Sequence, residues 1–146
     1  MKRIGIISVA IVALVGISFV VGRWLNNDTV ERGKVVELLR AQERGDAAAM
    51  EHDLTDCRDA GCQAIVRANA ARLRGHGELK IPLYESQTAH ALRSRTKFTR
   101  VVWFTTGRLT TVQCVLVRRT GNVLSGMAVT LLRVTAPIGR EASCPT

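Results

Sequence analysis

An uncharged run of nineteen residues, Ile4 to Gly22, constrains this chain more than any other feature of its sequence. As an α-helix the run would be about 28 Å long, close to the roughly 30 Å hydrocarbon core of a bilayer. Lys2 and Arg3 precede the run, and Arg23 and Trp24 follow it. Basic residues before a span favour a cytoplasmic amino terminus, and Trp24 stands where an interfacial aromatic residue is typical. We therefore expect a membrane-spanning signal anchor here.

Cleavage of this segment is the alternative, because Val20 and Gly22 fit a small-residue cleavage site. Cleavage near Gly22 would make the protein secreted. The run is longer than the roughly 7–15 apolar residues usual in a signal peptide, which favours the uncleaved form. We expect a single-pass anchor over residues 1–24, a short linker over 25–30 and one exported domain over 31–146.

All four cysteines, Cys57, Cys62, Cys114 and Cys144, lie beyond the apolar run. An even number in an exported domain indicates two disulfides, and four cysteines allow three pairings. Gly61 permits a turn that brings Cys57 close to Cys62, so we favour this pair and, by elimination, Cys114 with Cys144. The spacing disfavours a zinc site, which needs two close pairs, and a redox pair, which needs C-x-x-C. We expect no metal and no cofactor.

The spacing of apolar residues is helical before Gly77. Three segments have this spacing: residues 29–43, 47–54 and 62–74. Asp28 and Glu31 form a D-x-x-E pattern that resembles a capping box, which places a helix start there. The segment after the membrane span is therefore predicted to begin with three helices.

After Gly77 the pattern becomes that of strands. Four or five strands are predicted: an edge strand at 79–84, a weaker one at 86–93, and strong ones at 97–105, 109–119 and 123–134. Turns with glycine at 106–108 and 120–122 predict an antiparallel meander of the last three strands, with Trp103 in the core. We expect an α+β domain, with three helices packed on a curved antiparallel sheet in a cone-like arrangement.

The segment VVELLRAQERGDAAAMEHDL, from Val35 to Leu54, combines an apolar helix, a Gly-Asp break and a second short helix. It resembles the opening of the nuclear-transport-factor-2-like, or cystatin-like, superfamily, which implies the cone fold. The whole chain also resembles small membrane-anchored or secreted actinobacterial proteins of unassigned function. The segments that carry this resemblance are Cys57 with Cys62, ANAARLRGHGELKI (68–81), TRVVW (99–103), VQCVLVRRTGN (112–122) and APIGREASC (136–144). This resemblance implies a fold and an extracytoplasmic location, but it does not identify any catalytic residue in this chain.

Charge is distributed unevenly over the exported part. Residues 23–78 have a net charge of −1, whereas residues 79–146 hold ten basic residues and two acids, a net charge of +8. Six of the basic residues lie near predicted strand ends: Arg93, Arg95, Lys97, Arg100, Arg118 and Arg119. Such a patch would bind anionic lipid headgroups, envelope polymers or an acidic protein, although a solvated surface explains the same charges. Nucleic acid is disfavoured, because only 4% of residues are aromatic and no recognition motif is present.

Catalysis has one candidate group, Tyr84, Glu85 and His90. If these side chains faced the inside of the cone, a His–Glu pair there would act as a general base. A turn and a surface histidine explain the same residues, and no catalytic motif surrounds them. The enzyme interpretation is therefore the alternative.

We expect a non-enzymatic, membrane-tethered extracytoplasmic binding or assembly module, with a small-molecule binder or enzyme using the cone pocket as the alternative. Cone-fold domains on single anchors resemble accessory subunits of bacterial secretion and conjugation machines, which implies a cell-envelope or secretion complex as partner. The sequence leaves the oligomeric state open.

Overall fold

The computed structural model describes residues 2–88, 94–122 and 126–145; within these ranges the side chains of residues 2–5, 8, 9, 23–27, 122 and 126 are not described. The elements are α1 (Lys2–Arg44), α2 (Ala47–Asp53), α3 (Ala60–Arg72), β1 (Lys80–Ser86), β2 (Arg95–Phe104), β3 (Thr111–Asn122) and β4 (Gly126–Val134). This order, helices followed by antiparallel strands, confirms the α+β class.

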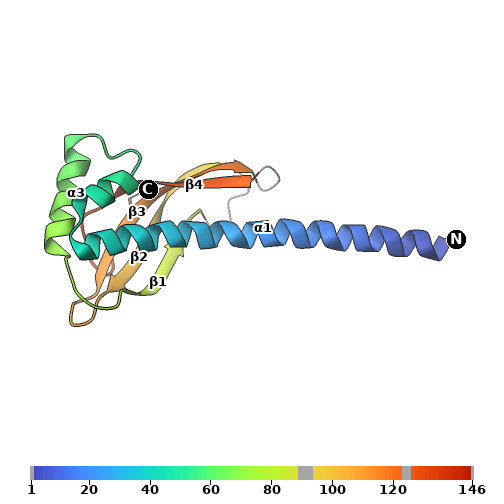
Figure 1. Cartoon of the computed structure of the whole chain (residues 1–146), viewed down its shortest axis with the longest axis horizontal. Helices are drawn as coiled ribbons and strands as arrows, with labels where there is room; N and C mark the ends of the chain where they lie inside the picture. The colour runs from blue at the N-terminus through green and yellow to red at the C-terminus, as the bar shows by residue number, and fades with distance from the viewer. Residues whose placement is uncertain (1, 89–93, 123–125, 146) are drawn as a thin grey trace.

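α1 is one continuous helix of 43 residues that extends far beyond the folded domain on its N-terminal side (Figure 1). Residues 25–30, expected to form a linker, are helical. The prediction that a capping box starts a new helix is wrong, because Asp28 and Glu31 lie within α1 and pair with Arg119. Since no glycine or proline lies between residues 23 and 32, nothing in the sequence interrupts the helical hydrogen bonds.

The N-terminal half of α1 leaves its large apolar side chains exposed. Eight of them are 57% to 72% exposed: Ile6, Ile7, Ile11, Val12, Leu14, Val15, Ile17 and Phe19. The side chains of Arg23 and Trp24, expected at a membrane interface, lie outside the described set. Among the residues described with their side chains, no helix combines the length and the apolar character needed to cross a membrane. The anchor therefore stays a prediction from the sequence.

The four strands form one sheet in the order β1-β2-β3-β4, and each pairs antiparallel with its neighbour. The predicted meander of the last three strands is thus confirmed. β1 shifts register between Lys80 and Leu83, around Pro82, which is consistent with its place at the edge of the sheet. Most of the weaker strand expected at 86–93 lies outside the described residues: Ser86 ends β1, Gln87 and Thr88 are in no strand, and residues 89–93 are not described.

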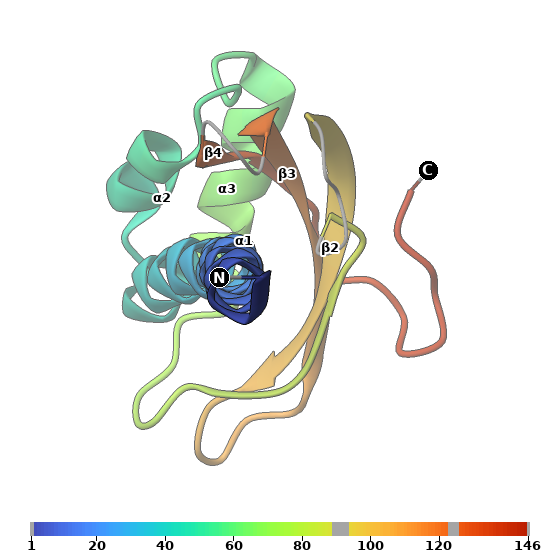
Figure 2. The same ribbon diagram turned by 90° about the vertical axis from the view of Figure 1, so that its right-hand side faces the viewer.

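The three helices cover one face of the curved sheet, and the C-terminal tail lies against the other (Figure 2). Alternate residues of β3 face the helices, and Val115 and Val117 among them are fully buried. They pack with a buried stripe on α1 that includes Val35, Leu38 and Leu39. The core therefore lies between the second half of α1 and the middle of the sheet, and Trp103, 2% exposed, belongs to it as predicted.

Two disulfides are present, Cys57–Cys62 and Cys114–Cys144, in the pairing that the sequence favours. The Cα atoms lie 5.2 Å and 5.7 Å apart, within the usual range for a disulfide. The first bridge closes the turn between α2 and α3, and the second fixes the tail to the outer face of β3. Two disulfides indicate that the protein folds in an oxidising, extracytoplasmic environment.

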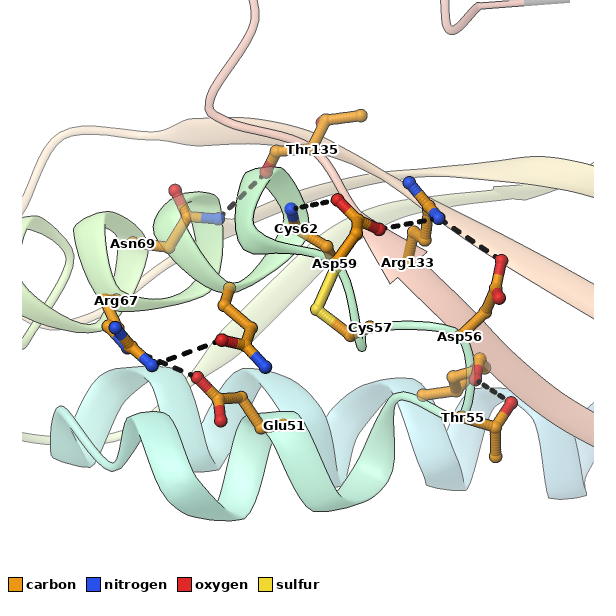
Figure 3. Close-up of a disulfide and its surroundings, with 12 residues drawn as sticks. Glu51, Thr55, Asp56, Cys57, Asp59, Cys62, Arg67, Asn69, Arg133 and Thr135 are labelled. Carbon is orange, nitrogen blue, oxygen red and sulfur yellow. Dashed lines mark hydrogen bonds and ion pairs between the residues drawn. A yellow bond between two sulfur atoms is a disulfide. The ribbon is translucent and has the colours of Figure 1, made fainter.

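The corner between α2 and α3 is also bound to β4 (Figure 3). Asp59 caps α3 by accepting a hydrogen bond from the Cys62 amide at 2.9 Å, and this bond holds the pKa of Asp59 below its usual value. The Arg133 guanidinium of β4 lies 2.8 Å from the Asp59 carboxylate and 3.3 Å from that of Asp56. The short helices are therefore held to the sheet edge by charge as well as by apolar packing.

Candidate functional site

A buried group of polar side chains joins α1 to the helix-facing side of the sheet. Its centre is Glu31, whose side chain is completely buried. It contains six residues, which we call the Glu31 cluster: Asp28 and Glu31 of α1, Tyr84 of β1, Thr88, Thr99 of β2 and Arg119 of β3. The cluster thus draws on α1 and three of the four strands.

Both carboxylate oxygens of Glu31 accept several hydrogen bonds. Oε1 accepts from the hydroxyls of Tyr84 and Thr99, each at 2.8 Å. Oε2 accepts from the Thr88 hydroxyl at 2.6 Å and from Arg119 Nε at 2.8 Å. The second nitrogen of that guanidinium, Nη2, lies 2.6 Å from Oε2 and also donates to Asp28 Oδ1 at 2.6 Å. The buried charges are therefore paired and hydrogen-bonded, which is the condition under which they are tolerated.

This environment keeps Glu31 ionised. Burial opposes ionisation, but the hydrogen bonds from nearby hydroxyls and from Arg119 outweigh it and hold the pKa of Glu31 below its ordinary value of 4.5. Burial and the adjacent Glu31 carboxylate raise the pKa of Tyr84, so its hydroxyl remains a donor. Burial disfavours the charged form of Arg119, but its hydrogen bonds to Asp28 and Glu31 raise its pKa overall. The pKa shifts of Glu31, Tyr84 and Arg119 therefore all favour an ionised Glu31, a protonated Tyr84 and a charged Arg119.

A second buried polar group lies further along α1. Gln42 and Gln113 exchange hydrogen bonds at 2.9 Å and 3.3 Å, and the Trp103 indole donates to Gln113 Oε1 at 2.8 Å. The Gln113 and Asn69 amides both donate to the Thr135 carbonyl. This group fixes α1 to β3 near the other end of the domain, so the two polar groups define the position of the helix along the strand.

The three residues predicted to line a catalytic pocket are not brought together. Tyr84 points to the helices and belongs to the Glu31 cluster, whereas Glu85 lies on the opposite face of β1 and pairs with Arg100 at 3.2 Å. Adjacent residues of a strand point to opposite faces, so Tyr84 and Glu85 do not share a pocket. His90 lies outside the described residues.

The six basic residues predicted to form one patch are also divided. Arg119 is 1% exposed and lies inside the Glu31 cluster. Arg100 lies on the outer face, where it contacts Glu85 and the Arg140 carbonyl, and Arg93 is outside the described residues. The three others are exposed at one end of the sheet, and we call them the basic rim: Arg95, Lys97 and Arg118.

A surface pocket of about 360 Å³ lies between α1, α2 and β4. Its lining includes Lys34, His52, Asp53 and Thr55. His52 Nδ1 is 3.6 Å from Asp53 Oδ1, which is too long for a hydrogen bond, and the Thr55 hydroxyl already donates to the Leu131 carbonyl. Among the described residues that line this pocket, none is placed to activate a nucleophile. Within the described part of the chain, no group of three or more metal-ligating side chains is placed to hold a metal ion.

Comparison with family models, curated proteins and solved structures finds no significant match to this chain. The resemblance to the nuclear-transport-factor-2-like superfamily and to small actinobacterial proteins therefore stays a prediction.

The Glu31 cluster was missed as a unit at the level of sequence, although a signal for it exists. Glu31, Val35, Leu38 and Gln42 recur at helical spacing, so an acid and an amide lie on the same face as the core residues. A buried acid needs a basic partner, and Arg119 continues the inward-facing alternation of β3 through Val115 and Val117. What the sequence does not provide is the register that brings residues 31 and 119 together.

Proposed function

We propose that this protein is a non-enzymatic, membrane-tethered extracytoplasmic module that binds or assembles with a partner at the membrane surface. The observation that carries the proposal is the continuity of α1. One helix contains both the uncharged run Ile4 to Gly22 and the residues that dock on the sheet. A helix is also the form in which a single segment satisfies its backbone polar groups within a bilayer.

The Glu31 cluster supports a rigid connection between tether and domain. Asp28 and Glu31 lie six and nine residues beyond Gly22, which corresponds to about 9 Å and 14 Å along a helix axis. α1 is therefore bonded to the sheet within about 14 Å of the end of the apolar run. A domain held in this way would follow the orientation of its anchor, as an assembly module requires.

The same cluster argues against catalysis inside the cone. The space between α1 and the sheet at this level is occupied by six mutually bonded side chains, and the central carboxylate has no oxygen left to act as a base. The alternative, a small-molecule binder or enzyme that uses the cone interior, thereby loses Tyr84 to the cluster and Glu85 to the opposite face of β1, while His90 lies outside the described residues.

Membrane extraction of the full-length chain tests the tether. Leu14→Arg places a charge near the middle of the run, at a cost of about 2.5–3.5 kcal/mol on the insertion scale. We expect the wild-type chain to resist alkaline carbonate and the variant to be released or degraded, whereas the control Leu14→Ile behaves as wild type. Recovery of the wild-type chain in the soluble fraction would contradict the anchor. A mature terminus at Arg23 would show cleavage instead.

Crosslinking in cells tests the assembly function. A defined protein captured by the wild-type chain and lost with Leu14→Arg would support a membrane-dependent partner. Capture of no specific protein by an inserted wild-type chain would contradict the assembly module. Direct ligand screening of the protein would then be the next step.

A further inference from the structure

α1 and β3 run antiparallel and remain in step. Asp28 and Glu31 meet Arg119 at one end, and Gln42 meets Gln113 at the other. From residue 28 to residue 42 a helix rises about 21 Å, and from 119 to 113 a strand spans about 20 Å. Each residue of β3 between 113 and 119 therefore lies beside a known position on α1, and distances along the helix also give heights along the strand.

The basic rim lies at the end of the sheet nearest the apolar half of α1. Arg95 is directly opposite Arg119 in the pairing of β2 with β3, and Thr96 is opposite Arg118. Arg95 and Arg118 are thus level with Asp28 and Glu31, about 9–14 Å along the helix from Gly22, and Lys97, opposite Val117, lies about 7 Å further along the strand. Figure 1 shows the end of β3 and the start of β4 directed toward the N-terminal half of α1.

The charge of the rim is not neutralised locally. Arg119 is balanced by Glu31 and Asp28, but among the described residues no carboxylate forms an ion pair with any rim residue. Several basic residues elsewhere on the domain have such partners: Arg67 pairs with Glu51, Lys80 with Glu78, and Arg133 with Asp56 and Asp59. The end of the sheet that faces the apolar half of α1 is therefore cationic.

We infer that the basic rim binds anionic phospholipid headgroups of the membrane that α1 enters; this inference rests on the proposed tether. The headgroup layer extends about 5–7 Å beyond the hydrocarbon core on each side. At a level of about 9–14 Å, the long side chains of Arg95 and Arg118 lie within about a Debye length, roughly 8 Å, of that layer, and Lys97 is the next basic residue behind them. Arg118 points outward, whereas Arg95 shares the face of Arg119, so the rim residues project from both faces of the sheet. The end of the sheet, and not one of its faces, therefore contacts the membrane surface.

The chain provides its own matched pair of reporters. Lys97 belongs to the rim, and Lys80 is an exposed lysine at the start of β1, opposite Phe104 and so at the far end of β2. The full-length protein would be placed in nanodiscs of phosphatidylcholine alone, or with about one third phosphatidylglycerol, and acetylated with a water-soluble reagent. Mass spectrometry then gives the rate for each lysine. We expect anionic lipid to slow acetylation of Lys97 about threefold or more and to leave Lys80 unchanged, with the difference abolished by high salt.

Two double variants test whether Lys97 is protected because the rim binds lipid or only because it lies close to an anionic membrane. Arg95→Gln with Arg118→Gln should remove most of the Lys97 protection, whereas Arg40→Gln with Arg44→Gln, which removes two exposed charges near the far end of α1, should retain it. Equal Lys97 rates in both lipids, or protection that survives in the rim variant, would overturn the inference and leave the tether intact. Failure of the wild-type chain to enter nanodiscs would overturn the tether and the inference together.

Discussion

The two halves of α1 are one helix with opposite surroundings. In the first half, side chains such as Leu14 and Val15 are 66% and 63% exposed, whereas in the second half Val35, Leu38 and Leu39 are fully buried. The first half is uncharged on every side from Ile4 to Gly22, and the second has a single buried stripe with charged residues between its members. The boundary between the exposed half and the docked half of α1 is therefore set by the side-chain pattern and not by a break in the backbone.

The largest effect on this comparison should come from Arg119→Ala. Removing the guanidinium leaves Glu31 buried without its ionic partner, which costs about 3–5 kcal/mol of unfolding free energy. Denaturant unfolding of the full-length chain in detergent measures this loss. The neighbouring Arg118→Ala, at an exposed position, should change stability by about 0.5 kcal/mol or less. Equal losses in the two variants would show that the cluster does not hold the second half of α1.

A smaller effect should appear in the pH dependence of the unfolding free energy, through Glu31 in the second half of α1. Because the pKa of Glu31 is lowered on folding, its stabilising contribution is complete above about pH 4.5 and is lost as the pH falls through the folded-state pKa. Glu31→Gln should therefore be less stable than wild type at pH 7, and the gap should narrow toward pH 3.

Unfolding midpoints of the two proteins between pH 3 and 7 test this directly. The difference between them is the relevant quantity, since Asp59 also has a lowered pKa and affects both proteins alike. A gap that stays constant over this range would contradict the assignment of Glu31 as an ionised, stabilised group in the folded state.

The smallest effect is expected from replacing one glycine by alanine in each half of α1 and comparing the stability of the two variants. Gly33 and Gly16 are helical, and an added Cβ would meet nothing within 4 Å at either position. Gly33→Ala should stabilise the domain by about 0.5–1 kcal/mol, because alanine restricts the unfolded chain more than glycine does. Gly16→Ala should leave the unfolding of the domain unchanged. Thermal unfolding of both variants measures this, and equal shifts would show that the two halves unfold as one unit.

Much of the fold follows from local patterns in the sequence. The change from helical to alternating spacing near Gly77, the glycine turns and the cysteine positions predict the helices, the meander and both disulfides. The D-x-x-E pattern at Asp28 gave a wrong helix start, because a capping box and a pair of acids in the middle of a helix have the same sequence. The two can be told apart only when the residues that bind the acids are known. The absence of glycine and proline between residues 23 and 32 agrees better with the continuous helix that the structure shows.

The candidate site was harder to predict, because it depends on contacts between distant parts of the chain. Arg119 was grouped with exposed arginines by its position near a turn, yet it lies 88 residues from Glu31 in sequence and bonds directly to it. Tyr84 and Glu85 were grouped as neighbours, although strand alternation sends them to opposite faces. Sequence proximity was in both cases a poorer guide than the face of the strand.

The continuity of α1 also fixes a rotational phase. Adding or removing one residue between Gly22 and Asp28 would turn the domain by about 100° around the helix axis and shift it by about 1.5 Å relative to the apolar half. The number of residues in this short segment therefore determines which side of the domain faces a neighbour beside the helix. A change of seven residues, close to two full turns, would nearly restore that facing while altering the height by about 10 Å.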